Sequence, residues 1–381
     1  MTVNGAVPAH RHAPHRRFHR LDGPLLLTSG HLLGHVRVAY ETYGELNTAR
    51  DNAVFVCHAL TGDAHVARHD DDDTAGWWDV MVGPGRPIDT DHLYVICANV
   101  LGGCAGTTAQ PSGASLPPVA IADMVAVHRS LVAALGVPRL RAVVGGSVGG
   151  MQTLEWLLRH PSDAAGFFIA AATDRQSADN LAWNAVARAA IRSDPEFRGG
   201  HYAPDAGPRD GLGTARMIAH LTYLSETSLR RKFGRGPRRP GTRSHPSSLV
   251  QGDFAVEGYL EHQAEKFVRR FDANSYLRLM GAMDGFDAFR EPDALAALDE
   301  VPPHVRLFSF THDRLYGPAH SRRIQSELAV RGVVAHHEED ATSDAGHDAF
   351  LLDVPPFLAA VGAFFHELQA RSRLPHTLTP R

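Results

Sequence analysis

Short apolar runs and segments with helical hydrophobic spacing alternate along most of this chain. The apolar runs predict buried β-strands at 52–57, 93–97, 143–144, 166–170, 305–313 and 332–336. Helical spacing predicts intervening helices at 121–135, which ends at Gly136, at 148–158 and at about 357–368. Two opening segments, 25–28 and 35–40, alternate in polarity and predict a pair of antiparallel strands. The rhythm predicts an α/β fold with a mostly parallel sheet.

The rhythm breaks between about 174 and 292. Within this block the pattern is mostly helical, and it predicts helices at 178–193, 214–225, 256–270 and 275–283. A helical block between two halves of a sheet is typical of a cap that covers an active site and excludes water. The sequence therefore predicts a disordered N-terminal tail at 1–20, a core formed by 21–173 and 296–372, a helical cap at 174–295, and a C-terminal tail at 373–381.

The sharpest chemical signal is the segment LRAVVGGSVGGMQTLE at 140–155, centred on Ser147. A β-branched run, a Gly-Gly-Ser-Val-Gly turn and a helical stripe follow one another, which is the strand–turn–helix arrangement of a nucleophile elbow. Gly145 and Gly149 are the small neighbours that such a turn requires. The turn also places the backbone N–H of Val148 at a helix N-terminus, where it can face an oxyanion.

An elbow serine needs a carboxylate and a histidine later in the chain, in that order. The predicted strand at 305–313 ends in Asp313, and the loop after the strand at 332–336 carries His347. The predicted catalytic triad is therefore Ser147, Asp313 and His347, with His347 as the general base and Asp313 holding its tautomer.

Several longer motifs carry a resemblance to a known family. They are HALTGD at 58–63, GWWD at 76–79, GPGRPID at 83–89, ANVLGGC at 98–104, the elbow, ARMIAHLTYLS at 215–225, KFVRRFDANSY at 266–276 and GHDAF at 346–350. Between about 36 and 365 the chain resembles the homoserine O-acetyltransferase family of acyltransferases. This resemblance implies an α/β-hydrolase fold with an inserted helical cap.

The resemblance also implies roles for individual residues. The backbone N–H groups of Leu60 and Val148 would form the oxyanion hole, Arg216 would pair with the substrate α-carboxylate, and Asp348 would hold its ammonium group. Tyr223 would lie on nearly the same face of its helix as Arg216. The implied reaction is a ping-pong transfer of acetyl from acetyl-CoA to L-homoserine, a step toward methionine, with no permanently bound cofactor. A homodimer is implied only by the resemblance.

Three departures from the family pattern keep alternatives open. Val148 stands where methionine is usual and Gly285 where a bulky aromatic is usual, so the pocket is expected to be roomier and L-serine or another alcohol is a rival acceptor. The segment at 107–118 is shortened. Relatives that use succinyl-CoA tend to carry arginine where Leu315 stands, which favours acetyl-CoA over that rival donor. An esterase with the same triad is the rival class, because fold alone does not separate it from a transferase.

Composition narrows the class further. The net charge is −4, with 44% hydrophobic and 21% charged residues, which does not favour a nucleic acid or membrane partner. No apolar run reaches a membrane span and no signal peptide is evident, so a cytoplasmic location is expected. The three cysteines are expected to be reduced, and the 24 histidines, several in the N-terminal segment, are expected to form no functional metal site. The acidic run at 70–73 and the basic run at 230–243 are expected to be solvated loops.

Overall fold

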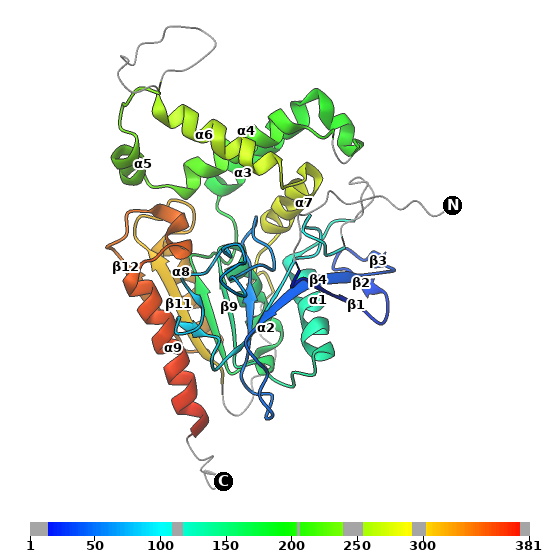
Figure 1. Ribbon diagram of the computed structural model, residues 1–381, viewed down its shortest axis with the longest axis vertical. Helices are drawn as coiled ribbons and strands as arrows, with labels where there is room; N and C mark the ends of the chain where they lie inside the picture. The colour runs from blue at the N-terminus through cyan, green and yellow to red at the C-terminus, as the bar shows by residue number, and fades with distance from the viewer. Residues whose placement is uncertain (1–13, 109–116, 204–205, 239–253, 292–301, 374–381) are drawn as a thin grey trace.

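The protein folds around an eight-stranded sheet of order β1-β4-β8-β5-β9-β10-β11-β12 (Figure 1). The computed structural model describes residues 14–108, 117–203, 206–238, 254–291 and 302–373. Strands β8, β5, β9, β10, β11 and β12 run parallel, whereas β1 and β4 add two antiparallel pairings at one edge. The α/β-hydrolase fold predicted from the sequence is confirmed by this arrangement and by the family match reported below.

The sheet strands are β1 (Arg17–Arg20), β4 (Arg37–Tyr43), β5 (Ala53–Cys57), β8 (Tyr94–Ala98), β9 (Ala142–Gly146), β10 (Gly166–Ala170), β11 (His304–Phe310) and β12 (Ala335–Asp340). Two small ribbons add β2 (Leu25–Leu26) with β3 (Leu32–Leu33), and β6 (Val82–Gly83) with β7 (Ile88–Asp89). The helices of the core are α1 (Ile121–Ala134), α2 (Val148–Arg159), α8 (Pro318–Val330) and α9 (Pro355–Arg373), with short 3₁₀ turns η2 (Pro161–Asp163) and η4 (Gly346–Leu351).

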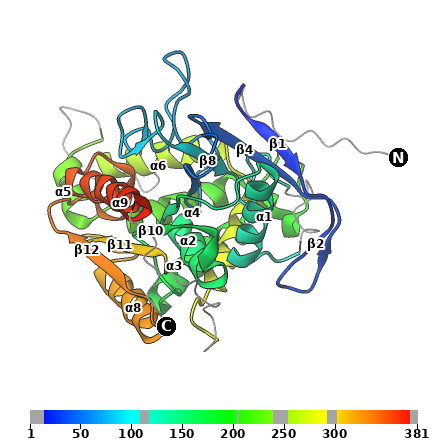
Figure 2. The same ribbon diagram turned by 90° about the horizontal axis from the view of Figure 1, so that it is seen from below.

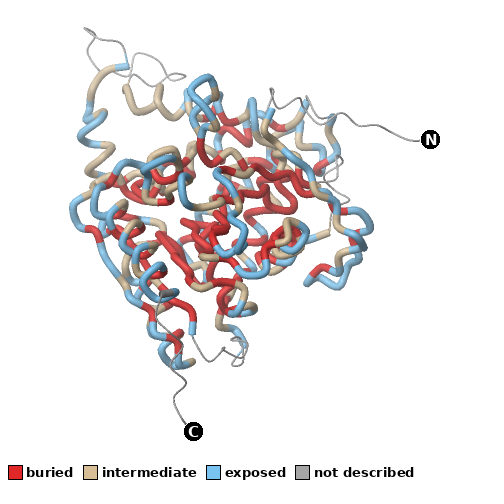
Figure 3. Tube along the Cα trace, turned by 60° about the horizontal axis from the view of Figure 1, so that its bottom comes forward, coloured by how far each residue is buried: buried red, intermediate tan, exposed pale blue. Residues whose placement is uncertain are grey.

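Successive strand residues point into two separate hydrophobic clusters, one on each face of the sheet. Phe55 and Val143 join the cluster beneath α1, α2 and α8, whereas their neighbours Val54 and Val144 join the cluster beneath α9. Figure 2 shows α9 on one side of the sheet and α2 and α8 on the other. Because both faces are covered, the parallel strands are apolar throughout, and Figure 3 shows the buried residues gathered at the centre of the molecule.

A helical cap lies over the carboxyl ends of the parallel strands (Figure 1). It consists of α3 (Ala178–Ser193), η3 (Pro195–Gly200), α4 (Arg209–Tyr223), α5 (Glu226–Lys232), α6 (Ala255–Val268) and α7 (Ala273–Asp284). The helix α3 has the bounds that its periodicity predicts, and α4, α6 and α7 lie within a few residues of theirs. The cap therefore comes between the elbow and the segments that carry Asp313 and His347.

Three local predictions are wrong at the edges of the sheet. The tail predicted at 1–20 ends too late, because Arg17–Arg20 pair with Arg37–Tyr43 as an antiparallel edge strand. The segment at 25–28 pairs through Leu25–Leu26 with Leu32–Leu33, and not with the strand predicted at 35–40. The strand predicted at 332–336 begins only at Ala335, because Gly332 has a φ of 79° and forms the turn after α8. Backbone hydrogen bonds to a neighbour decide these edges.

Several sequence predictions fall outside the described residues. The shortened segment at 107–118 is described only at its ends, the basic run at 230–243 only as far as residue 238, and the C-terminal tail at 373–381 only at its first residue. Within the described helices, none combines the length and apolar character needed to cross a membrane. None of the three cysteines forms a disulfide.

The aromatic cluster beneath α9 gives a test of the core. The Phe357 ring is fully buried, and its centroid lies 5.0 Å from Phe308, 5.5 Å from Phe310, 6.1 Å from Phe168 and 6.4 Å from Trp78. We expect Phe357→Ala to lower the free energy of unfolding by about 3–5 kcal/mol, because it leaves a cavity among rings that cannot close over it.

Urea unfolding followed by circular dichroism measures this change. The control Val330→Ala alters a side chain that is 83% exposed, and we expect it to stay within about 0.5 kcal/mol of the unmodified protein. Equal losses for the two variants would contradict the assigned core.

Candidate active site

The turn between β9 and α2 holds Ser147 in a strained conformation, with φ 59° and ψ −124°. A residue with a side chain rarely adopts positive φ, so close packing on both sides must hold the turn. A Cβ atom on Gly145 would lie 2.2 Å from the Gly149 carbonyl oxygen, and one on Gly149 would lie 2.0 Å from the Cys57 carbonyl oxygen. Only glycine fits at either position, as the nucleophile-elbow interpretation requires.

The structure brings the three predicted triad residues into one hydrogen-bonded line. His347 Nε2 lies 2.8 Å from Ser147 Oγ, and His347 Nδ1 lies 2.7 Å from Asp313 Oδ2. The second oxygen of Asp313 accepts the backbone N–H groups of Leu315 and Tyr316 at 2.8 and 2.9 Å. Because the Asp313 carboxylate accepts a hydrogen bond from Nδ1–H, that nitrogen keeps its proton, and Nε2 has a lone pair for the serine hydroxyl. All three side chains are buried.

The surroundings of His347 favour its protonated form. Burial opposes the charged ring, but the carboxylate of Asp313, its hydrogen bond and the carboxylate of Asp348 together outweigh burial, so the pKa of His347 is raised. An imidazole with a raised pKa is a stronger base for the serine proton.

The two predicted oxyanion donors lie at the ends of β5 and β9. Within the described chain, the backbone N–H groups of Leu60 and Val148 donate no hydrogen bond to another group. His58 supports this loop, since its Nδ1 donates to the next carbonyl at 2.7 Å and its Nε2 accepts the Val100 N–H at 3.1 Å. The Gln152 amide also donates to the His58 carbonyl at 3.1 Å. The loop is thus fixed by hydrogen bonds that leave its Leu60 amide available.

Arg216 lies on α4, with two of its three guanidinium nitrogens buried and without a hydrogen-bond partner in the described chain. Its Nε and Nη1 atoms are buried and form no hydrogen bond with any described residue. The guanidinium carbon lies 5.6 Å from the centroid of the Tyr223 ring and 4.8 Å from that of Phe267. The Tyr223 ring lies in turn 5.8 Å from the His347 ring. A buried, unpaired guanidinium requires an anion, so this position is suited to a substrate carboxylate.

Asp348 is half-buried beside the triad histidine on the 3₁₀ turn Gly346–Leu351. Burial raises the pKa of Asp348, the positive charges of His347 and Arg216 act against that rise, and the Asp313 carboxylate adds to it. The site therefore contains a carboxylate and a guanidinium whose charges act on each other. The predicted binding of an amino acid would use one group of each charge.

Sequence reasoning missed two neighbours of this site. His220 lies one helical turn after Arg216, its Nδ1 lies 3.3 Å from the Tyr259 hydroxyl, and its Nε2 is buried without a partner among the described residues. Tyr316 meets the His347 ring edge-on, with centroids 5.3 Å apart. The spacing of residues 216, 220 and 223 on one helical face was the available signal for His220.

A narrow pocket lies next to the triad, between α3, α4, α7 and the loop that carries Leu60. Its walls include Leu60, Ala215, Tyr223, Tyr276, Leu315 and Tyr316. None of the described residues that line it carries a charge. The pocket is therefore suited to an uncharged group close to the nucleophile.

The chain is similar to several known proteins in sequence and fold. A family model described as "alpha/beta hydrolase fold" matches residues 52–354. Homoserine O-acetyltransferase of Caulobacter vibrioides is 46% identical over 355 residues, which cover 90% of this chain and 92% of that protein. This chain belongs to the homoserine O-acetyltransferase family. The same level of similarity extends to a homoserine O-succinyltransferase of Nocardioides sp., which is 45% identical over 354 residues, covering 90% of this chain and 95% of that protein.

The family resemblance found from the sequence motifs is thereby confirmed. A solved structure of esterase E22 is also similar, with a TM-score of 0.82 and 24% identity over 92% of this chain and 99% of that chain. At that identity the likeness concerns the fold alone. The homoserine O-acetyltransferase family therefore shares its backbone with an esterase, and side chains must distinguish the two activities.

The environment of His347 predicts a pH dependence. A general base acts when neutral, so the rate should fall as the pH drops through the raised pKa of His347, above the ordinary value of about 6.5. Asp348→Asn removes one of the charges that raise this pKa. We expect the acidic limb of the profile to move to lower pH in this variant.

Release of p-nitrophenol from p-nitrophenyl acetate measures this limb without an amino-acid acceptor. The matched control is Asp353→Asn, which alters an exposed carboxylate nearby and should leave the profile in place. A limb that stays fixed or moves to higher pH in Asp348→Asn would contradict the assigned electrostatics.

Proposed function

We propose that this protein transfers an acetyl group from acetyl-CoA to the γ-hydroxyl of L-homoserine through a covalent acyl-enzyme. The observation that carries the proposal is the pair of unpartnered, buried guanidinium nitrogens of Arg216, which Tyr223 separates from the Ser147–His347–Asp313 triad. An aligned triad supplies the nucleophile, and guanidinium nitrogens without a hydrogen-bond partner supply a site for the α-carboxylate of an amino acid.

In the first half-reaction, Ser147 Oγ attacks the thioester carbonyl and its proton passes to His347 Nε2. The backbone N–H groups of Leu60 and Val148 stabilise the negative oxygen of the tetrahedral intermediate, a contribution of about 10²- to 10³-fold in rate for one donor. The carbon–sulfur bond then breaks, and His347 returns the proton to the leaving thiolate. Acetyl-Ser147 and free coenzyme A result.

In the second half-reaction, L-homoserine enters with its carboxylate on Arg216 and its ammonium group near Asp348. His347 takes the proton of the γ-hydroxyl, whose oxygen attacks the acetyl carbon. Collapse of the intermediate breaks the ester to Ser147 Oγ, which regains its proton from His347. The product is O-acetyl-L-homoserine, and the triad is restored.

The charged groups on the acceptor side favour a transferase over an esterase. Hydrolysis of a simple ester requires no partner for Arg216, and leaving two of its nitrogen atoms buried and unpaired costs stability. An amino-acid acceptor would supply a carboxylate for these nitrogen atoms, and this contact would favour the acceptor over water. Tyr223 lies between Arg216 and His347, where it is suited to orient the acceptor.

The pocket walls favour acetyl as the transferred group. Leu315 lines the pocket next to Tyr316, at the position where relatives that use succinyl-CoA tend to carry arginine. A succinyl group would bring its free carboxylate into a pocket whose described lining is uncharged. Succinyl-CoA remains the rival donor, because a homoserine O-succinyltransferase is equally similar in sequence.

We also propose that two copies of the chain associate through α3. This helix exposes Leu181 and Val186, which are 40% and 54% exposed, whereas Trp183 on its other side lines the pocket next to the triad. Neighbouring alanines extend the apolar surface along the helix. A contiguous apolar helix face of this kind is typical of a contact between subunits.

The role of Arg216 gives a direct test of the acceptor site. Lysine keeps the charge but not the planar pair of donors, so we expect Arg216→Lys to raise KM for L-homoserine by about 10- to 100-fold, corresponding to about 1.5–3 kcal/mol for a hydrogen bond to a charged group. The rate of acetyl-Ser147 formation should change little. The control Arg209→Lys alters an exposed arginine on the same helix. Loss of acylation rate with KM unchanged would reject the assigned role.

The acyl-enzyme itself is tested by mass spectrometry of the intact protein. After mixing with acetyl-CoA alone we expect one acetyl adduct that Ser147→Ala abolishes, and L-homoserine should discharge the adduct faster than L-serine or water. Discharge by water at the same rate would assign the protein to the esterases. An adduct formed from succinyl-CoA but not from acetyl-CoA would overturn the donor.

A further inference from the structure

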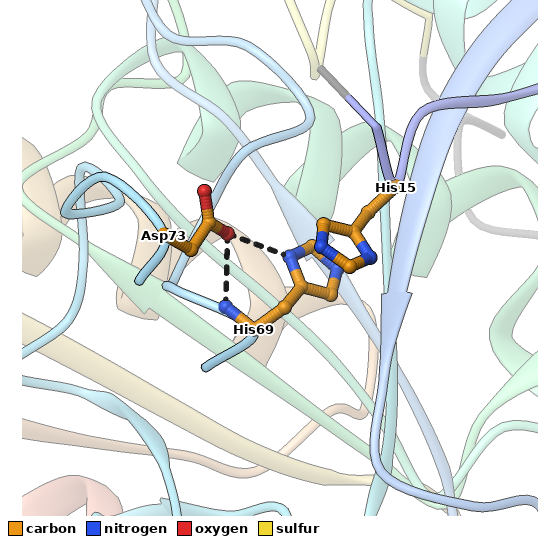
Figure 4. A group of neighbouring side chains, drawn as sticks. All are labelled: His15, His69 and Asp73. Atoms are coloured by element: carbon orange, nitrogen blue, oxygen red, sulfur yellow. Dashed lines mark hydrogen bonds and ion pairs between the residues drawn. The ribbon is translucent and has the colours of Figure 1, made fainter. Parts of the chain in front are cut away.

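A second cluster of chemically active side chains lies away from the triad, where the chain enters the sheet. His15 precedes β1, and His69 and Asp73 belong to the loop between β5 and β6. One potential ligand atom from each of these residues lies within 4.8 Å of the other two. Figure 4 shows the His15 ring stacked over that of His69, with the Asp73 carboxylate beside it.

His69 has the arrangement of a histidine prepared to bind a metal ion. Its Nδ1 lies 3.1 Å from Asp73 Oδ2, and its Nε2 is buried without a partner in the described chain. The ring is held between His15 and Tyr43, with centroids at 3.9 and 4.3 Å. The 3.1 Å between His69 Nδ1 and Asp73 Oδ2 is close to the separation of two ligands on one tetrahedral ion, so these two atoms can bind the same ion once Nδ1 carries no proton.

A second group shares His69 and consists of Glu41, His65 and His69. His65 cannot serve as a ligand there, because its Nδ1 lies 2.9 Å from Glu41 Oε2 and its Nε2 lies 2.9 Å from the carbonyl of Thr74. Both partners are acceptors, so both ring nitrogens carry protons and neither offers a lone pair. This leaves the group that contains His15 and Asp73.

We propose that His15, His69 and Asp73 bind one divalent transition-metal ion, with Zn²⁺ as the ion that best fits two imidazoles and one carboxylate. Three protein ligands of this kind leave the fourth tetrahedral position to water. Ligand atoms of a tetrahedral zinc site lie about 3.3 Å apart, so binding requires the His15 ring to turn out of its stack on His69 until one of its nitrogens faces the ion. This proposal departs from the sequence-based expectation that the histidines form no functional metal site.

The bound ion would join two segments that are distant in sequence. His15 comes immediately before the edge strand Arg17–Arg20, and the loop of His69 and Asp73 follows the strand that leads to Leu60. None of the triad residues belongs to the site. The ion would therefore stabilise the attachment of the N-terminal segment without taking part in acyl transfer, so the inference does not depend on the proposed function.

The experiment uses the untagged, full-length protein, stripped with a chelator and titrated with Zn²⁺ by isothermal calorimetry. We expect one ion per chain and a thermal midpoint that rises with zinc concentration. His69→Gln and His15→Gln should each weaken binding by at least about tenfold. The control His336→Gln replaces an exposed histidine of β12 and should leave binding unchanged.

Two control measurements test whether the change in zinc binding is specific to the proposed ligands. The metal-free thermal midpoints of His69→Gln and the unmodified protein should agree, which separates loss of a ligand from loss of the fold. The double variant His10→Gln/His12→Gln should bind zinc normally. Zinc binding unchanged by His69→Gln and His15→Gln, or binding abolished in the double variant, would overturn the proposal.

Discussion

The close approach of strand β9 to helix α2 is the constraint on which the site depends. The backbone of Gly149 packs directly against the carbonyl of Cys57, and that of Gly145 against Gly149, with no space for a side chain at either place. This contact holds Ser147 at positive φ and turns its hydroxyl toward His347. It also brings α2 against β5, so the two amides predicted to form the oxyanion hole lie on the same small region of backbone. The strain at one residue is therefore balanced by packing throughout the centre of the sheet.

The sequence predicts the interior of this fold better than its margins. Buried strands such as Ala53–Cys57 and Gly166–Ala170 are apolar because helices cover both faces, and that composition is visible in the chain. The edge strands Arg17–Arg20 and Ala335–Asp340 are rich in charged residues and histidine. Their backbone groups pair with a neighbour whatever their side chains are, so no hydrophobic periodicity marks them.

The site shows the same division between local and long-range information. Ser147 is recognisable because the elbow needs glycines at fixed spacing, and Asp313 and His347 follow in the order that the fold requires. The unpaired state of Arg216 and the neighbourhood of His220 depend on how α4, α6 and the 3₁₀ turn Gly346–Leu351 pack together. Those contacts join segments far apart in sequence, so no local sequence motif marks them.

The cap interrupts the core in a way that matters while the chain is being synthesised. The ribosome completes the strained elbow early, but the histidine that hydrogen-bonds to Ser147 lies 200 residues further along. His347 follows α3 to α7 and the strands β11 and β12 in the sequence, so all of these segments must leave the exit tunnel before the base reaches the nucleophile. Strand β11 pairs with β10, which precedes the cap. Domains fold in the order of their synthesis, so a nascent chain would hold an elbow without a base. Reactivity would therefore appear only after the cap and the segment that carries His347 have both been made.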